Sequence, residues 1–82
     1  MGLHSLALGS DGRVRAWGAN YWGQLGDGTT NSKTLPMTLP GLTNVVMVSA
    51  GTGHSLATMA NSSVWQWGMT VTGAISTPAQ VP

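Results

Sequence analysis

The chain has 82 residues, of which only 6% are charged, and its formal net charge at pH 7 is +1. A unit of this length buries only about 60% of the surface of its unfolded chain, so we expect it to need a partner or further copies of itself. The near-neutral charge excludes the basic surface that binds a phosphate backbone, and we therefore expect no nucleic-acid partner.

The first predicted element is a β-hairpin whose strands run from Leu3 to Leu8 and from Val14 to Gly18. The Asp11-Gly12 pair between the two segments suits a tight hairpin turn. We therefore expect the second segment to return antiparallel to the first.

A loop from Ala19 to Thr34 follows this hairpin and is rich in Gly, Asn and Thr. Its apolar members Tyr21, Trp22 and Leu25 predict a loop that packs on the sheet rather than a free linker. A phosphate-binding loop would need a Gly-Lys pair that opens a helix, and the sequence contains no such pair. We therefore assign the glycines of this loop to turns.

Two proline-bracketed segments and one apolar run predict the next strands. Pro36 to Pro40 and Pro78 to Pro82 each bracket a short strand, and proline at strand ends favours outer, edge positions in a sheet. The run from Val45 to Val48 is continuous and rich in β-branched residues, which is the pattern of a strand covered on both faces. We expect it to be the most buried strand of the chain.

A second hairpin is predicted from His54 to Met59 and from Val64 to Gly68, with a turn at Asn61-Ser62. Asn61 stands in this turn where the first hairpin has Asp11. Asparagine tolerates a left-handed backbone nearly as well as glycine, so we expect the turn to survive the loss of the Asp-Gly pair.

The two hairpins repeat the same sequence pattern. His4 opens a His-Ser-Leu-Ala string that returns at His54, and Trp17-Gly18 returns as Trp67-Gly68. Such a repeat is typical of an array in which each unit buries its apolar face against a neighbour. We interpret both histidines as structural, hydrogen-bonding between strands or blades, because a metal or acid–base role would have to occur twice with no carboxylate nearby. The two tryptophans are expected to fill gaps between sheets.

Two further tryptophans are not part of the repeat. Trp22 corresponds to Thr72 in the other copy, and Trp65 corresponds to Arg15. Tryptophan, tyrosine and arginine are the residues most often found at interface hot spots. We therefore predict a protein-interaction surface that includes Arg15, Tyr21, Trp22 and Trp65, with packing of Tyr21 under its loop as the alternative.

Together these strings resemble a known repeat family. His-Ser-Leu-Ala-Leu from His4, an Asp-Gly turn, Val-x-x-Trp-Gly from Val14 and Gly-Gln-Leu-Gly-Asp-Gly from Gly23 are similar to the repeat of the regulator of chromosome condensation (RCC1) family, especially its bacterial members. The resemblance implies an all-β fold of antiparallel four-stranded blades, arranged as a β-propeller, usually of seven blades. Fewer than two blades are expected here.

The resemblance also implies how the chain divides. Residues 1–35 would be a partial repeat, containing the last two strands of a blade and the Gly-rich loop. Residues 36–82 would be a second repeat with a shortened loop, in which 36–68 form a nearly complete blade and the last segment is the first strand of a further blade. The chain would then be a piece of a longer propeller, a short protein that closes by assembling copies, or a degenerate reading frame.

The function implied by the resemblance is that of a non-enzymatic protein-binding module or a fragment of a propeller scaffold. Members of the family promote nucleotide exchange on a small GTPase, dock on chromatin or inhibit β-lactamases, and a remnant of an exchange regulator or inhibitor is one alternative. The other alternative is a structural blade unit that assembles with copies of itself through exposed strand edges and the run from Val45 to Val48.

The remaining residue types offer little chemistry. The chain has no cysteine, and Asp11 and Asp27 are its two carboxylates, so we predict no catalytic residues, no metal site, no cofactor and no small-molecule substrate. No apolar run approaches the roughly 18 residues of a membrane span, and Met1 to Gly9 does not read as a signal peptide. The cellular compartment stays open.

Overall fold

The structure is a computed structural model that describes residues 4–70 and 73–81, and these residues form β-strands and turns without a helix. No helix capable of crossing a membrane is therefore found among them. In chain order, the strands are β1 (His4–Leu8), β2 (Val14–Gly18), β3 (Lys33–Thr38), β4 (Val45–Ala50), β5 (His54–Met59), β6 (Val64–Thr70) and β7 (Gly73–Gln80). The predicted all-β class is confirmed.

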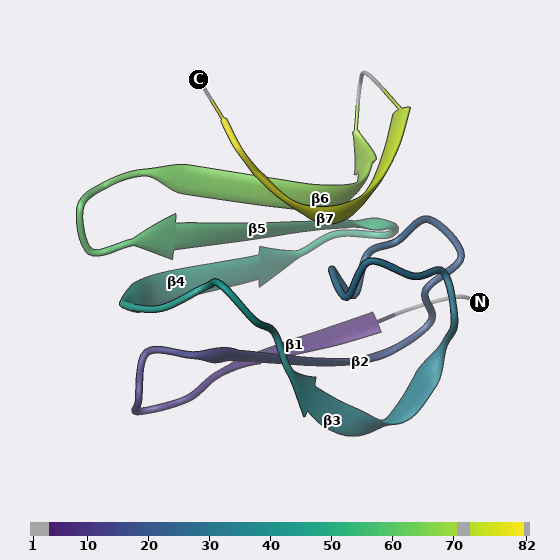
Figure 1. The fold of residues 1–82 in the computed structure, drawn as a ribbon, viewed down its shortest axis with the longest axis horizontal. Coiled ribbons are helices and arrows are strands. Elements are labelled where there is room, and N and C mark those ends of the chain that lie inside the picture. Colours follow the sequence, from purple (N-terminus) through teal and green to yellow (C-terminus); the bar gives the residue numbers. More distant parts are fainter. Residues whose placement is uncertain (1–3, 71–72, 82) are drawn as a thin grey trace.

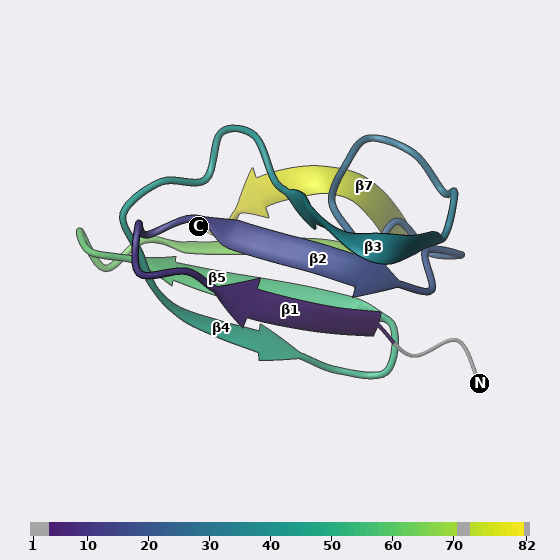
Figure 2. The ribbon, with the colours of Figure 1, turned by 90° about the horizontal axis from the view of Figure 1, so that it is seen from below.

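The strands form two antiparallel sheets, which Figures 1 and 2 show lying one against the other. Sheet A has the order β1-β2-β3, and sheet B has the order β4-β5-β6-β7. Both predicted hairpins are present and share one register: His4 pairs with Gly18 in sheet A, and His54 pairs with Gly68 in sheet B. The start of the first hairpin at Leu3 lies outside the described residues.

The sheets group the strands differently from the expected blade boundaries. The last strand, β7, pairs with β6, so it completes sheet B and is not the first strand of a further blade. In the same way β3 pairs with β2, and it belongs to sheet A rather than to a blade running from 36 to 68. Gly18 and Gly68 stand at the register shifts of β2 and β6 and have positive φ, 106° and 92°, and the strands that follow, β3 and β7, lie at the outer edges of the same sheets. The boundary of the sequence repeats at 35/36 remains a prediction.

The proline-containing strands β3 and β7 are the outer strands of their sheets, as predicted. They begin earlier than expected, so that Pro36 and Pro78 lie inside the strands rather than at their ends. A proline is tolerated there because an edge strand can direct the backbone position without N–H away from the ladder. Pro82, the expected end of the last strand, lies outside the described residues.

The prediction for the run from Val45 to Val48 is wrong. The side chains of Val46 and Met47 are 57% and 62% exposed. The reason is that the core covers only one face of β4, and a bulge between Val45 and Met47 disturbs the alternation of side chains along the strand. Only Val45 and Val48 pack on the core.

The turn of the second hairpin is kept, but by a different residue from the one predicted. Ser62, not Asn61, adopts the left-handed backbone, with φ of 73°. Asn61 contributes its side-chain oxygen instead, which accepts a hydrogen bond from the N–H of Ser63 at 3.0 Å. Asp11 accepts the equivalent bond from the N–H of Arg13 at 3.1 Å in the first hairpin.

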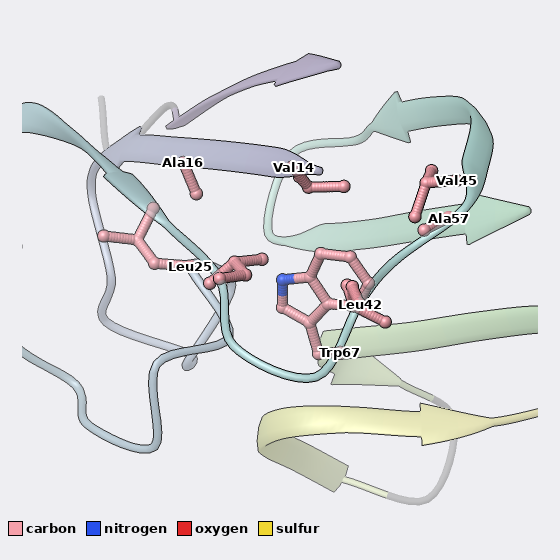
Figure 3. Packing of buried hydrophobic residues seen from close by; sticks show 8 residues of the cluster. Val14, Ala16, Leu25, Leu42, Val45, Ala57 and Trp67 are labelled. Atoms are coloured by element: carbon pink, nitrogen blue, oxygen red, sulfur yellow. The ribbon is translucent and has the colours of Figure 1, made fainter. Parts of the chain in front are cut away.

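The hydrophobic core lies between the two sheets. Figure 3 shows the indole of Trp67 among Leu25, Leu42 and Val14, and Trp67 itself is completely buried. Trp17, for which the same role was expected, is only half-buried and lies outside the core. The two tryptophans differ because Trp67 is on the face of β6 that meets sheet A, whereas Trp17 is on the face of β2 opposite to the buried Val14 and Ala16.

Candidate protein-interaction surface

A hydrogen-bonded chain through His4 joins the two sheets. The Nε2 atom of His4 lies 2.8 Å from Oγ of Ser55, and the Ser55 hydroxyl donates to the carbonyl of Gln24 at 2.7 Å. Because that hydroxyl has a single proton, His4 is the donor to Ser55, and in the neutral imidazole this assigns the proton to Nε2 and leaves Nδ1 without one. This Nδ1 atom is buried without a partner among the described residues. Burial, and secondarily the proximity of His54, lower the pKa of His4.

His54 occupies the equivalent position in sheet B, but its surroundings differ. Its side chain is half-buried, whereas His4 is only 8% exposed. The structural role for His4 therefore has a visible partner, Ser55, in the neighbouring sheet. For His54 the same role remains a prediction.

The loop after β2 is held by Asn20, a completely buried residue that the sequence interpretation missed. Its side-chain nitrogen donates to the carbonyls of Thr29 and Asn31 at 2.9 and 3.0 Å, and its oxygen accepts the N–H of Leu25 at 2.9 Å. One sequence signal was available: the other copy has Thr70 at this position and has also lost the loop.

Asp27 braces the same loop. Its Oδ1 atom accepts from the N–H and the hydroxyl of Thr29 at 2.9 and 2.8 Å, and its Oδ2 atom lies 3.5 Å from the ammonium of Lys33. Burial raises the pKa of Asp27, but the hydrogen bonds from Thr29 and Asn20, together with the charge of Lys33, outweigh it and leave the pKa below its usual value. Asp27 is therefore an ionised structural anchor.

Two aromatic side chains project from this braced loop. Tyr21 is 69% exposed and Trp22 is 46% exposed, so the alternative that Tyr21 packs under the loop is wrong. The backbone N–H of Trp22 donates to the buried Gln24 side chain at 2.8 Å. One side of the Trp22 ring lies against Gly53, where an added Cβ would come within 2.7 Å of the ring.

Met69 of sheet B is hydrogen-bonded to the same Gly53 that lies against Trp22. Its N–H donates to the carbonyl of Gly53 at 2.7 Å, and its side chain is 40% exposed. We call Tyr21, Trp22, Gly53 and Met69 the aromatic patch. Gly68 lies directly against Gly53, and a Cβ at Gly68 would collide with the carbonyl oxygen of Gly53.

Arg15 is not part of the aromatic patch. It lies on β2, where its guanidinium forms a two-pronged ion pair with the carboxylate of Asp11 at 3.0 and 3.1 Å. The hydrogen bond from Arg15, followed by that from the N–H of Arg13, lowers the pKa of Asp11 to about 2. Arg15 therefore stiffens the first hairpin, and its charge is already paired.

Trp65 is also separate from the patch. It is half-buried on β6, and its indole N–H donates to Oγ of Ser63 at 3.2 Å. It lines two open hollows, one of about 310 Å³ beside Asn44 and Asn61 and one of about 280 Å³ beside Leu42 and Pro78. Of the four predicted interaction residues, the structure therefore brings only Tyr21 and Trp22 together.

Comparison with known proteins identifies the repeat. The family model "Regulator of chromosome condensation (RCC1) repeat" matches residues 11–58. Human protein RCC2 is 36% identical over 89 residues, a match that covers 95% of this chain and 17% of RCC2.

Solved structures with the same arrangement of strands support this match. The crystal structure of human WBSCR16 superposes with a TM-score of 0.87 at 27% identity, covering 98% of this chain and 23% of that one. The crystal structure of Kap60 bound to yeast RCC1 (Prp20) gives a TM-score of 0.81 at 26% identity, covering 98% of this chain and 21% of the matched one. The chain thus spans less than a quarter of each of these proteins.

Proposed function

Because this chain belongs to the regulator of chromosome condensation (RCC1) repeat family, we propose that it is a non-enzymatic protein-binding module whose contact surface is the aromatic patch. The exposure of Tyr21 and Trp22 on a loop that is otherwise anchored by buried residues carries this proposal. The solved complex of a relative, yeast RCC1 (Prp20), with the protein Kap60 supports a protein as the class of partner.

The loop that carries the aromatic patch is already ordered in the free chain. Binding costs free energy for every side chain and loop that must be ordered, and a loop already fixed by Asn20 and Gln24 avoids much of that cost. A large aromatic side chain at the centre of an interface contributes more binding energy than most of its neighbours. Trp22 is held by Gly53 on one side and is open on the other, which is the geometry of such an anchor.

The partner can be sought by selection from a displayed library of protein fragments. We expect clones that bind the wild-type chain and lose at least tenfold in affinity towards the double variant Tyr21→Ser/Trp22→Ser, since removal of a hot-spot side chain costs about 2 kcal/mol or more. Leu35→Ser is the matched control, because Leu35 is 75% exposed on β3, outside the patch.

The selection also has a result that would overturn the proposal. Clones that bind the wild-type chain, the double variant and the control equally would place the binding surface elsewhere. Far-ultraviolet circular dichroism of all three proteins checks that the substitutions leave the fold intact.

A further inference from the structure

Burial reverses between equivalent residues of the two hairpins. Ser55, Ala57 and Trp67 of sheet B are buried, whereas Ser5, Ala7 and Trp17 of sheet A are exposed or half-exposed. The buried residues lie on the face of sheet B that meets sheet A. Their repeat equivalents therefore form an open face on the far side of sheet A.

The opposite reversal occurs on the other faces. His4, Val14 and Ala16 of sheet A are buried, whereas His54, Val64 and Gln66 of sheet B are half-exposed. The outer face of sheet B is therefore open. It is the repeat equivalent of the inner face of sheet A, the face that packs on sheet B. The chain carries both halves of one interface on its two outer sides, in addition to the complete interface in its interior.

We propose that the open face of sheet B binds the open face of sheet A of a second copy of this chain, repeating the interior contact between sheets A and B. The occupant is a second copy because the template for the contact is within the molecule. Sheet A already packs on sheet B through His4 and Leu6, and the equivalents on sheet B, His54 and Leu56, point outward. The inference does not depend on the aromatic patch.

The interior contact specifies the hydrogen bond expected between copies. Nε2 of His4 donates to Oγ of Ser55 in the chain. In the assembly, Nε2 of His54 donates to Oγ of Ser5 in the second copy. Ala7 of that copy then takes the place that Ala57 has in the interior contact. Ala57 is 1% exposed there, so the contact has no room for a larger side chain at this position.

Three differences from the template make this contact weaker than the interior one. Gln66 replaces Ala16, Arg15 replaces Trp65, and the loop that places Leu25 over Trp67 has no full equivalent after β6. The contact between copies therefore lacks part of the apolar filling of the core. We expect an association that depends on protein concentration rather than a permanent complex.

Pairing of sheet edges, the other way in which copies could join, is disfavoured by the edges themselves. The outer strands β3 and β7 contain Pro36 and Pro78, and β4 contains a bulge after Val45. Proline and bulges are devices that prevent strand addition at an edge. The remaining edge strand, β1, lies against β4.

A face-to-face contact of this kind joins two different surfaces, so a copy with one blocked face still has one free face. Ala7→Arg blocks the face of sheet A, and Leu56→Arg blocks the face of sheet B. By light scattering across a concentration series, we expect the wild-type mass to rise with concentration and each variant to stay monomeric. An equal mixture of the two variants is expected to reach twice the monomer mass and no more.

A control variant and two replacement variants complete the assembly experiment. Tyr21→Lys alters the aromatic patch and is expected to assemble as the wild type does. Ser5→Arg and Gln66→Arg replace the two blocking variants if circular dichroism shows that either fails to fold. A wild-type chain that stays monomeric up to its solubility limit, variants that assemble unchanged, or a mixture that stays monomeric would each overturn the proposal.

Discussion

At the scale of single residues, two hairpin turns with the same backbone path use different residues. Gly12 in the first turn and Ser62 in the second both have positive φ, 76° and 73°. A left-handed backbone is unfavourable for a residue with a Cβ and free of this cost for glycine. Ser62 is therefore a locally strained position, whose side chain makes no contact that explains the choice of serine.

Ser62→Gly is expected to stabilise the chain. Relief of left-handed strain, worth about 1–2 kcal/mol, exceeds the extra backbone entropy that glycine loses on folding, about 0.5–1 kcal/mol, so we expect a net gain of about 0.5–1 kcal/mol. Urea unfolding followed by circular dichroism measures it. The reverse change, Gly12→Ser, should destabilise the chain, and an unchanged or lower midpoint for Ser62→Gly would contradict the turn assignment.

The buried His4 predicts a loss of stability in acid. Its pKa is lower in the folded chain than the ordinary value of 6.5, so the unfolded chain binds more protons below that pH. This contribution to stability is present above pH 6.5 and is lost as the pH falls from there through the lowered pKa of the folded chain. His4→Gln is expected to reduce the pH dependence of the thermal midpoint over this window. His54→Gln is expected to reduce it less, because the proximity of His54 is only the lesser cause of the lowered pKa of His4. A dependence unchanged in His4→Gln would contradict this role of His4.

At the scale of elements, local patterns predicted the hairpins and failed where neighbours decide the structure. Alternating side chains and turn residues determine how β1 pairs with β2, and those signals lie within a few residues of each other. Burial of Val46 and Trp17 depends on which sheet covers each face, and this information lies outside the strand. Arg15 and Trp65 share a strand position and are held by local partners, Asp11 and Ser63, and their part in an interaction surface stays a prediction.

Asn20 could not be recognised as an anchor from local sequence because its partners are distant. Its side chain bonds to Thr29 and Asn31, which are nine and eleven residues further along the chain. Only the folded loop brings these carbonyls to one amide. Several hydrogen bonds converge on Asn20, and together they fix the loop that carries the aromatic patch.

Asn20→Ala is therefore expected to loosen the loop. The change leaves the buried N–H of Leu25 and two carbonyls without their partner, which costs about 1–3 kcal/mol. Urea unfolding measures this loss, and hydrogen exchange should speed up in residues 20–31. Asn31→Ala is the matched control because Asn31 is exposed and its part in the network is made by its backbone carbonyl. Equal stability of the two variants would show that Asn20 does not anchor the loop.

At the scale of the whole molecule, the described residues form two sheets with one filled interface between them and an open face on either side. The filled interface contains Trp67, and its repeat equivalent Trp17 lies on an open face. A repeat array gains its stability from contacts between neighbouring units. The proposed assembly follows from this arrangement, because the two open faces are the repeat equivalents of the two faces that form the filled interface.

The most direct test of this account compares the unfolding free energies of Trp67→Ala and Trp17→Ala with that of the wild-type chain, at a concentration where the chain is monomeric. We predict a loss of about 3–5 kcal/mol for Trp67→Ala, enough to unfold a domain of this size, because the indole fills the core between the sheets. For Trp17→Ala we predict a loss several times smaller. Equal losses for the two variants would contradict the assignment of one filled interface and two open faces.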